Sequence, residues 1–347
     1  MKKFILSERE IDEIKSLVKG ITSQYSSAED DRFLKDASII AHELPKRIRT
    51  FINDFRLLEP SSGVCLISGY PISEEKIGKT PSHWQYRQEI SPALEEEIIL
   101  ILFSTLLGDV IGWSTQQAGH IVHDVIPIQG HEHEQLGSST KELLWWHNED
   151  AFHPYRGDYL GMMCLRNKEK AATTVAPVDA TSYLNPEEIA ILFEPRFTIR
   201  PDESHLVKNK SDLQKTQANN DNLLSSAYQK ISEINSEPEK ISVFYGDPKC
   251  PYVRIDPYFM DINKLEDDNE ALTAMNKLIK SIESNLTELV LQPGDFIFID
   301  NYKAVHGRKP YTTMYDGQHR WLKRIIVARD LRKSRSARPT ATSRIIF

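Results

Sequence analysis

Hydrophobic residues in the first third of the chain recur every three or four positions, the spacing that places them on one face of a helix. Residues 7–19 follow this pattern and open with a serine that has a glutamate three positions later, a capping box. Residues 31–58 continue it, and Pro45 is where a helix there would break in two. Residues 91–107 are nearly all apolar after an acidic first turn, which predicts a helix packed inside the protein.

After residue 110 the pattern changes to short apolar or alternating runs bounded by turn residues, which indicates β-strands. An earlier run of this kind occupies residues 64–67. A Pro-Gly-Asp turn within residues 289–301 predicts a hairpin-like pair of strands, whereas residues 266–286 return to helical spacing. Further strands are expected at residues 121–128, 159–165, 171–178, 241–245, 252–255 and 320–331.

Helices followed by short strands predict a single mainly β domain across residues 1–347, a jelly-roll sandwich with helical buttresses. Residues 1–110 would supply mostly helical support, residues 111–331 the jelly-roll core, and residues 332–347 a solvated tail. Residues 180–240 differ from the rest of the core, because a short helix is followed there by a polar run. We interpret them as a lid-like insertion whose loop covers the site, and a plain disordered insertion is the alternative.

Composition narrows the class of protein. The chain has 347 residues, 40% hydrophobic residues and a net charge of -7, which indicates a globular protein and argues against a nucleic-acid partner. Its three cysteines are widely separated and form no disulfide framework, which favours a reducing, cytoplasmic location. No apolar run is long enough to span a membrane. Composition therefore argues against nucleic-acid and membrane partners, and the sequence leaves assembly into a homo-oligomer open.

Candidate metal chemistry begins at His147-Asn148-Glu149, which follows an apolar run. At the end of a strand, alternation sends His147 and Glu149 to the same face, where the two side chains can share a metal. Neutral imidazole and carboxylate suit Fe(II), and a second histidine would complete the facial triad of non-haem iron oxygenases. The motif alone is also compatible with a solvated polar turn.

A second histidine, His306, follows the last strand of residues 289–301 and is far from His147 in sequence. It supplies the third ligand that a facial triad requires. Four other histidines precede the motif, but without nearby cysteines their spacing does not fit a closed zinc site. They are His120, His123, His131 and His133.

Two arginines strengthen the iron hypothesis. Arg320 and Arg324 are separated by an even number of residues, so both project from one face of the strand expected at 320–331. Buried guanidinium groups are costly unless each pairs with an anion, either in a structural salt bridge or in a bound ligand. 2-Oxoglutarate would fit, because its keto acid takes two metal positions, its far carboxylate needs an arginine, and the third position stays open for O2.

Together these segments resemble the Fe(II)/2-oxoglutarate-dependent oxygenases of the clavaminate-synthase-like branch, especially bacterial hydroxylases of free L-arginine and L-lysine. The resemblance covers about residues 63–329 and rests on WHNEDAFHPYRGDYLGMMCLRN, LQPGDFIFIDNYKAVHGRKPY and QHRWLKR, which occur in the family's order and spacing. It implies a double-stranded β-helix, a distorted jelly roll. It also implies Fe(II), 2-oxoglutarate and O2, with release of succinate and CO2.

The resemblance assigns roles by position. His147, Glu149 and His306 would bind iron. Arg320 would hold the distal carboxylate of 2-oxoglutarate, and Thr174 would assist it.

The amino-acid end is assigned in the same way. Arg324 would clamp the α-carboxylate of the substrate, and Glu149 would also accept from its α-amine. Gln116 matches a glutamine that contacts the substrate backbone, with Gln117 as the alternative.

The side-chain end decides the substrate. Asp256 matches a carboxylate that receives the cationic side chain in the arginine hydroxylases, where a second acid follows two residues later. Here that position is Tyr258, and one carboxylate with a phenol suits an ammonium better than a forked guanidinium. The sequence therefore favours hydroxylation of free L-lysine, at C4 rather than C3, with L-arginine as the alternative. Asp261 is a rival to Asp256 if the alignment shifts.

Other classes of protein remain as alternatives. A non-catalytic jelly-roll binding module would need neither iron nor two inward arginines. A metal-dependent hydrolase would need zinc and a general base instead of an anion clamp. A halogenase is disfavoured, because Glu149 fills the metal position that halide would take.

Overall fold

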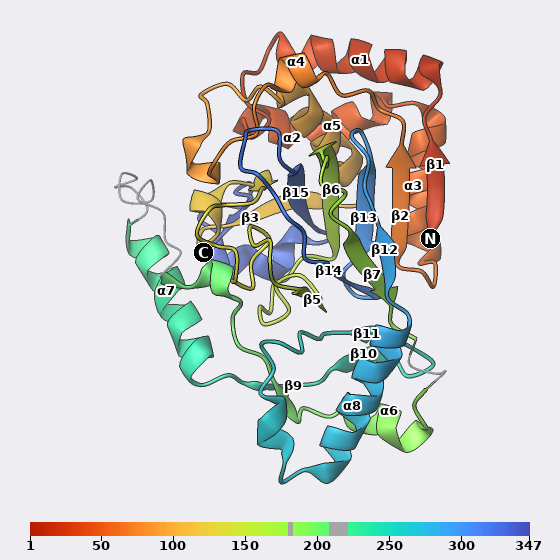
Figure 1. Ribbon diagram of the computed structural model, residues 1–347, viewed down its shortest axis with the longest axis vertical. Coiled ribbons are helices and arrows are strands. Elements are labelled where there is room, and N and C mark those ends of the chain that lie inside the picture. Colours follow the sequence, from red (N-terminus) through yellow and green to blue (C-terminus); the bar gives the residue numbers. More distant parts are fainter. Residues whose placement is uncertain (180–182, 208–220) are drawn as a thin grey trace.

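The computed structural model describes residues 1–179, 183–207 and 221–347, and strands from distant parts of the chain form its large central sheet (Figure 1). The strands of this sheet are β1 (Lys2–Ile5), β2 (Val64–Ser68), β3 (Asp109–Trp113), β4 (His123–Val125), β6 (Tyr159–Arg166), β13 (Phe296–Asp300), β15 (Trp321–Ala328) and β16 (Ile345–Ile346). Their order is β1-β2-β13-β6-β15-β3-β16, and β4 also pairs with β15. Strands that the sequence separates by more than a hundred residues are therefore neighbours.

A smaller sheet lies against the large one. Its strands are β5 (Leu144–His147), β7 (Thr173–Pro177), β12 (Thr287–Leu289) and β14 (Ala304–Arg308), in the order β12-β7-β14-β5. Leu66, Met162 and Ile297 of the large sheet share one apolar cluster with Val175 and Ala304 of the small sheet. Burial of this shared layer holds the sheets together. The predicted strand core is confirmed, and both sheets are open.

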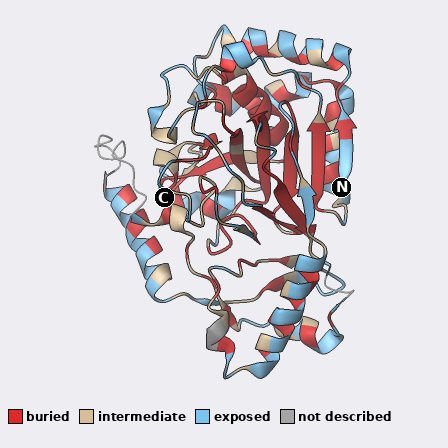
Figure 2. Ribbon diagram, viewed as in Figure 1, coloured by how far each residue is buried: buried red, intermediate tan, exposed pale blue. Residues whose placement is uncertain are grey.

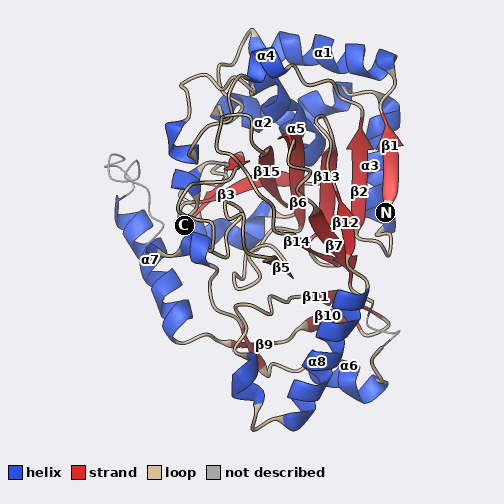
Figure 3. Cartoon of the chain, viewed as in Figure 1, coloured by secondary structure: helices blue, strands red, loops and turns tan. Residues whose placement is uncertain are grey.

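The predicted N-terminal helices cover one side of the large sheet (Figures 1 and 3). The first begins with the expected capping box, in which Ser7 and Glu10 bond each other's backbone N–H. Pro45 does separate two helices. The last helix is almost wholly buried between the outer helices and the sheet (Figure 2). The predicted helices are α1 (Glu8–Thr22), α2 (Asp31–Ile40), α3 (Lys46–Leu58) and α5 (Leu94–Thr105), and the short helix α4 (Glu74–Ile77) was not predicted.

A second apolar cluster lies below the small sheet, where two helices pack on each other and on the outer side of β7 (Figure 1). Ala176 and Val305 of the small sheet are part of this cluster. Its elements are α6 (Pro186–Leu192), α8 (Asn269–Ser284), β8 (Phe197–Thr198), β9 (Lys240–Ile241), β10 (Phe244–Asp247) and β11 (Cys250–Val253). The helix α7 (Asp221–Ser236) runs along one side of the molecule. None of the described helices is long and apolar enough to cross a membrane.

The hairpin expected within residues 289–301 is wrong. β12 pairs with β7 in the small sheet, whereas β13 pairs with β2 and β6 in the large one. The turn between them carries the chain from one sheet to the other. Gly294 has a φ of +84°, and a Cβ there would lie 1.7 Å from the carbonyl oxygen of Tyr70, so the crossing requires glycine.

Two other segments are more ordered than expected. The tail at residues 332–347 is not solvated along its length, because β16 pairs in parallel with β3 and the buried Arg338 donates to four backbone carbonyls. Of the polar run in the expected lid, residues 208–220 lie outside the described residues. The part that follows forms α7, so the expected loop includes a helix.

The strand expected at residues 121–128 is shorter than expected, because only β4 is formed there.

Asp300 gives a pH-dependent contribution to stability. Burial raises the pKa of this carboxyl to about 7, and the nearby charge of Glu59 adds to the rise. The folded protein therefore holds this proton more tightly than the unfolded chain does. The free energy of unfolding should fall as pH rises from about 4 to about 7, by at most about 4 kcal/mol at 1.4 kcal/mol per pKa unit.

Asp300→Asn should remove this pH dependence while keeping the side-chain oxygen that accepts from the N–H of Tyr302. Urea unfolding at pH 5 and pH 8 should show the variant gaining stability on the parent as pH rises. Asp316→Asn is the matched control, since Asp316 accepts the same kind of backbone bond, from Gln318, at a more exposed turn. If the two variants show the same pH dependence, the burial of Asp300 does not have this effect.

Candidate active site

Pairing between β5 and β14 brings the three expected metal ligands together. His306 lies opposite His147 in the ladder, and their ring centroids are 4.5 Å apart. The Nε2 atom of His306 is 3.2 Å from Oε2 of Glu149. One ligand atom from each of the three side chains falls within 4.8 Å of the others. The geometry matches what a single metal ion needs.

Two asparagines fix the loop that carries these ligands. Asn148 is fully buried, donates to the carbonyl of Ala304 at 3.0 Å and accepts from the N–H of Ile255 at 2.9 Å. Asn301 accepts from the N–H of Glu149 at 2.7 Å and donates back to its carbonyl at 3.0 Å. Asn148, which lies between the two ligands, and Asn301, in the loop before β14, therefore hold His147 and Glu149 in register with His306. Sequence analysis assigned no role to either asparagine.

The three side chains fit Fe(II). Nδ1 of His147 is 2.7 Å from the carbonyl of Trp145, so Nδ1 donates and Nε2 is free to bind a metal. Burial alone would raise the pKa of Glu149, but the charge of Arg324 and the hydrogen bond from His306 outweigh burial and hold that pKa well below its usual range. Arg324 occupies Oε1, which leaves Oε2 facing His306. Two imidazoles and one carboxylate oxygen are the donor set of a facial triad.

A pair of buried arginines lies beside the triad. Arg320 is 3% exposed, and its Nε and Nη1 atoms have no hydrogen-bond partner among the described residues. Arg308 is 2% exposed, and burial together with the charge of Arg320 lowers its pKa to about 10. Both line the same cavity as the three ligands. Sequence analysis gave Arg308 no role.

The threonine beside these arginines differs by one position from the expected one. Thr173 pairs with Arg308 and lines the cavity. Thr174 pairs with Gly307, and successive side chains on a strand point to opposite faces. The expected Thr174 is therefore on the other side of the small sheet.

At the other end of the cavity Arg324 is surrounded by polar groups. It bonds Glu149, and its Nη2 is 2.7 Å from Nδ1 of His123 and 3.4 Å from Oε1 of Gln116. Because burial lowers the pKa of His123 far below its usual value, this imidazole is neutral and accepts the bond. Gln117 instead bonds both backbone groups of Asp124, so Gln116 is the glutamine that reaches Arg324.

Of the expected side-chain residues, Asp256 and Tyr258 both line the cavity. Asp256 is buried, and burial raises the pKa of its carboxyl to about 6. Tyr258 is 50% exposed at the rim. The rival residue Asp261 is paired with Arg200 at 2.9 Å and does not line this cavity.

A segment that sequence analysis treated only as part of a lid adds further polar groups. Asp202 and Ser204 line the cavity. His205 next to them is completely buried, with Nε2 2.9 Å from Asp150 and Nδ1 2.7 Å from the hydroxyl of Thr115. This imidazole anchors the segment beside Glu149. No motif marks these residues, because they lie in a polar stretch far along the chain from the ligands.

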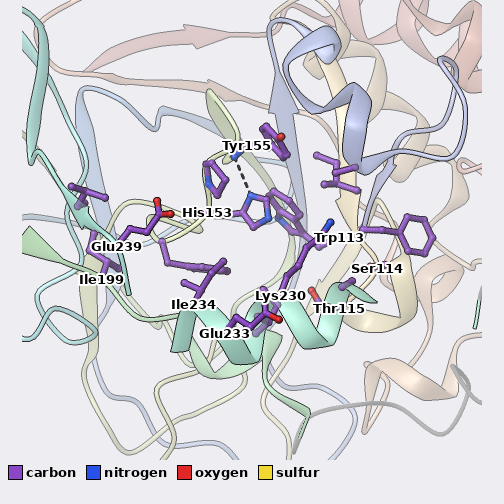
Figure 4. A pocket seen from close by; sticks show the side chains of 18 of the residues that line it. Trp113, Ser114, Thr115, His153, Tyr155, Ile199, Lys230, Glu233, Ile234 and Glu239 are labelled. Carbon is purple, nitrogen blue, oxygen red and sulfur yellow. Dashed lines mark hydrogen bonds between the residues drawn. The ribbon is translucent and has the colours of Figure 1, made fainter. Parts of the chain in front are cut away.

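A larger cavity, of about 730 Å³, lies between α7 and the side chains of Trp113 and His153 (Figure 4). The indole N–H of Trp113 donates to Asp150 at 2.6 Å, and its ring lies 4.2 Å from that of His153. None of the three metal ligands lines this cavity. The metal chemistry therefore belongs to the smaller cavity of about 100 Å³ that contains them.

Comparison with known proteins agrees with this geometry. The sequence model of the family described as taurine catabolism dioxygenase TauD, TfdA family, matches residues 49–326. The L-ornithine/L-arginine 3-hydroxylase of Catenulispora acidiphila is 42% identical over 333 residues, 95% of each chain. The enduracididine beta-hydroxylase of Streptomyces hygroscopicus is 39% identical over 342 residues, 99% of this chain and 98% of that protein.

A solved structure is similar over its whole length. The non-heme iron oxygenase OrfP, crystallised with Fe, succinate and (3S)-hydroxy-L-Arg, superposes with a TM-score of 0.93 at 40% identity and covers 100% of both chains. Lysine hydroxylases match at lower identity. The L-lysine 3-hydroxylase of Catenulispora acidiphila is 26% identical over 96% of this chain and 86% of its own length.

Substitution of His306 tests the metal site. His306→Ala removes the ligand that β14 contributes, so Mn(II) affinity, measured by electron paramagnetic resonance of free Mn(II), should fall by more than roughly 100-fold. His133→Ala is the control, because His133 is exposed and bonds Glu142. If both variants keep the parent's affinity, the metal is held elsewhere.

Proposed function

Because the chain belongs to the TauD/TfdA family of iron- and 2-oxoglutarate-dependent oxygenases and is an amino-acid hydroxylase, we propose that it hydroxylates free L-arginine at C3. The more similar relatives act on arginine, ornithine or enduracididine, whereas the lysine hydroxylases are more distant. The comparisons thus favour the alternative, arginine, over lysine. The position C3 follows the 3-hydroxylase and the beta-hydroxylase among the relatives.

The observation that carries the choice of arginine is that Asp202 and Asp256 line one cavity. The preference for lysine rested on a single carboxylate, since Tyr258 occupies the position where the arginine hydroxylases have a second acid. Asp202 provides that second acid from another part of the chain. Two carboxylates suit a planar guanidinium, whose donors form a fork, better than they suit one compact ammonium.

The other end of the substrate would lie at Arg324. Its guanidinium would take the α-carboxylate, and Gln116 beside it would contact the substrate backbone. Oε1 of Glu149, next to Arg324, is placed to accept from the α-amine. With the amino acid held at both ends, the carbons between them would pass the three metal ligands.

Arg320 would hold the distal carboxylate of 2-oxoglutarate, with the hydroxyl of Thr173 in place of the expected Thr174. When bound, Fe(II) would activate O2, which is the oxidant: one of its oxygen atoms would enter succinate as 2-oxoglutarate loses CO2, and the other would enter the C–H bond. The protein's own residues orient both organic molecules and exclude water from the buried end of the cavity.

We also assign the two open sheets to the double-stranded β-helix of this family.

L-Ornithine is a second candidate substrate, because the relative from Catenulispora acidiphila is named for both amino acids. Its ammonium would still meet an acid, Asp256, at the same end of the cavity. A single ammonium lacks the forked donors with which a guanidinium can bond two carboxylates.

Substrate choice can be measured directly. With Fe(II), 2-oxoglutarate and O2, succinate should form at least about tenfold faster with L-arginine than with L-lysine, a difference of about 1.4 kcal/mol. Nuclear magnetic resonance of the product should place the new hydroxyl on C3. Faster turnover of lysine, or a hydroxyl on C4, would contradict the proposal.

Asp202→Asn tests the second carboxylate. The amide keeps the oxygen that accepts from the N–H of Ser204 but removes the charge. We expect KM for arginine to rise about tenfold, since a bond to a charged group contributes about 1.5–3 kcal/mol, while KM for 2-oxoglutarate stays within about twofold. Asp261→Asn, at the ion pair with Arg200, is the control outside the cavity. Equal effects of the two variants on the KM for arginine would show that Asp202 does not meet the substrate.

A further inference from the structure

Two buried cations lie together, and in the part of the chain that the structure describes no carboxylate pairs with either of them. Arg308 and Arg320 are 2% and 3% exposed, and neither forms an ion pair with any carboxylate among the described residues. Their guanidinium carbons lie 5.1 Å and 6.0 Å from the ring centroid of Tyr311. Burial of two like charges is costly unless an anion compensates them. The arrangement therefore suits a bound anion.

Neutral groups hold Arg308 in place without neutralising it. Its Nη2 donates to the hydroxyl of Ser139 at 2.7 Å and to the carbonyl of Glu142 at 3.4 Å, and its Nη1 donates to the carbonyl of Lys309 at 2.8 Å. Its Nε, like the Nε and Nη1 of Arg320, has no hydrogen-bond partner within residues 1–179, 183–207 and 221–347. Each arginine therefore keeps at least one donor for a ligand.

The position of Arg308 points to the co-substrate. It lies two residues after His306 on β14, so both side chains extend from the same face of the strand, and both line the cavity. Its partner in the ladder is Thr173, which also lines the cavity. Arg308 is thus on the side of the metal ligands where Arg320 lies.

We propose that Arg308 is a second binding residue for 2-oxoglutarate, and that it shares the distal carboxylate with Arg320. The inference rests on the co-substrate of the family and is independent of which amino acid is hydroxylated. A carboxylate has four oxygen lone-pair sites, enough to accept from the free Nε of Arg308 and from an unpartnered donor of Arg320. The enzyme would then select 2-oxoglutarate over 2-oxo acids that lack a second carboxylate.

A purely structural role for Arg308 makes a different prediction. Its bond to Ser139 ties the segment before β5 to β14. If this tie were its only function, Ser139→Ala and Arg308→Gln would affect the protein alike. If the charge of Arg308 binds 2-oxoglutarate, only Arg308→Gln weakens the binding of the co-substrate.

Calorimetric titration of 2-oxoglutarate into Mn(II)-loaded enzyme, without amino acid or O2, separates these roles. We expect Arg308→Gln to weaken the binding of 2-oxoglutarate at least about tenfold, which is the effect of losing a charge-assisted bond. We expect the affinity of Ser139→Ala for 2-oxoglutarate to stay within about twofold of the parent's. The Mn(II) affinity of both variants should match that of the parent. Equal weakening by the two variants, or unchanged binding in Arg308→Gln, would overturn the proposal.

Arg308→Lys covers the case in which the glutamine variant does not fold. Lysine keeps the charge but loses the Nε–H and the neutral bonds that fix its direction, so we expect 2-oxoglutarate to bind about three- to tenfold more weakly. Parent-like affinity in this variant would contradict a contact through Nε. Because no amino acid is present, the result does not depend on arginine being the substrate, and an enzyme that binds 2-oxoglutarate as expected but ignores arginine would contradict only the proposed function.

Discussion

The register between β5 and β14 is the constraint on which the site depends. It sets His306 opposite His147, and a slip of one residue would turn His306 to the other face of the small sheet. Asn148 and Asn301 secure this register with buried hydrogen bonds that cross between the ligand loop and the start of β14. Trp146 of β5 and Val305 of β14 share the second apolar cluster, which keeps both strands in place. Metal binding is thus a consequence of strand pairing.

Charged side chains in the cavity are grouped by the sign of their charge. Arg320 and Arg308 lie on one side of the ligands, and Asp202 and Asp256 line another part of the cavity. Burial of two like charges, as at the arginines, stabilises no protein by itself. The proposed ligands would compensate both groups, with a dicarboxylate at the arginines and a cationic side chain at the aspartates. Arg324, already paired with Glu149, joins the metal site to the amino-acid end.

Sequence reasoning named the three clustered metal ligands and several other residues that line the cavity, because these residues stand in local patterns. The histidine-carboxylate motif, His306 and the even spacing of Arg320 and Arg324 were sufficient to suggest iron and 2-oxoglutarate. The face of β7 to which each threonine points could not be decided without the strand register. Thr174 was therefore predicted to assist 2-oxoglutarate, whereas Thr173 lines the cavity. Asp202 was missed because a polar stretch carries no periodic signal, and the preference for lysine followed from that omission. The hairpin failed because a turn does not reveal that its two strands join different sheets.

The most direct test of this account is a crystal structure of the enzyme grown without O2 in the presence of Fe(II), 2-oxoglutarate and L-arginine. We expect one iron bound by His147, Glu149 and His306, with the guanidinium of the substrate between Asp202 and Asp256. An iron that lacks any of these ligands would contradict the central claim. So would an arginine whose side chain turns away from both aspartates.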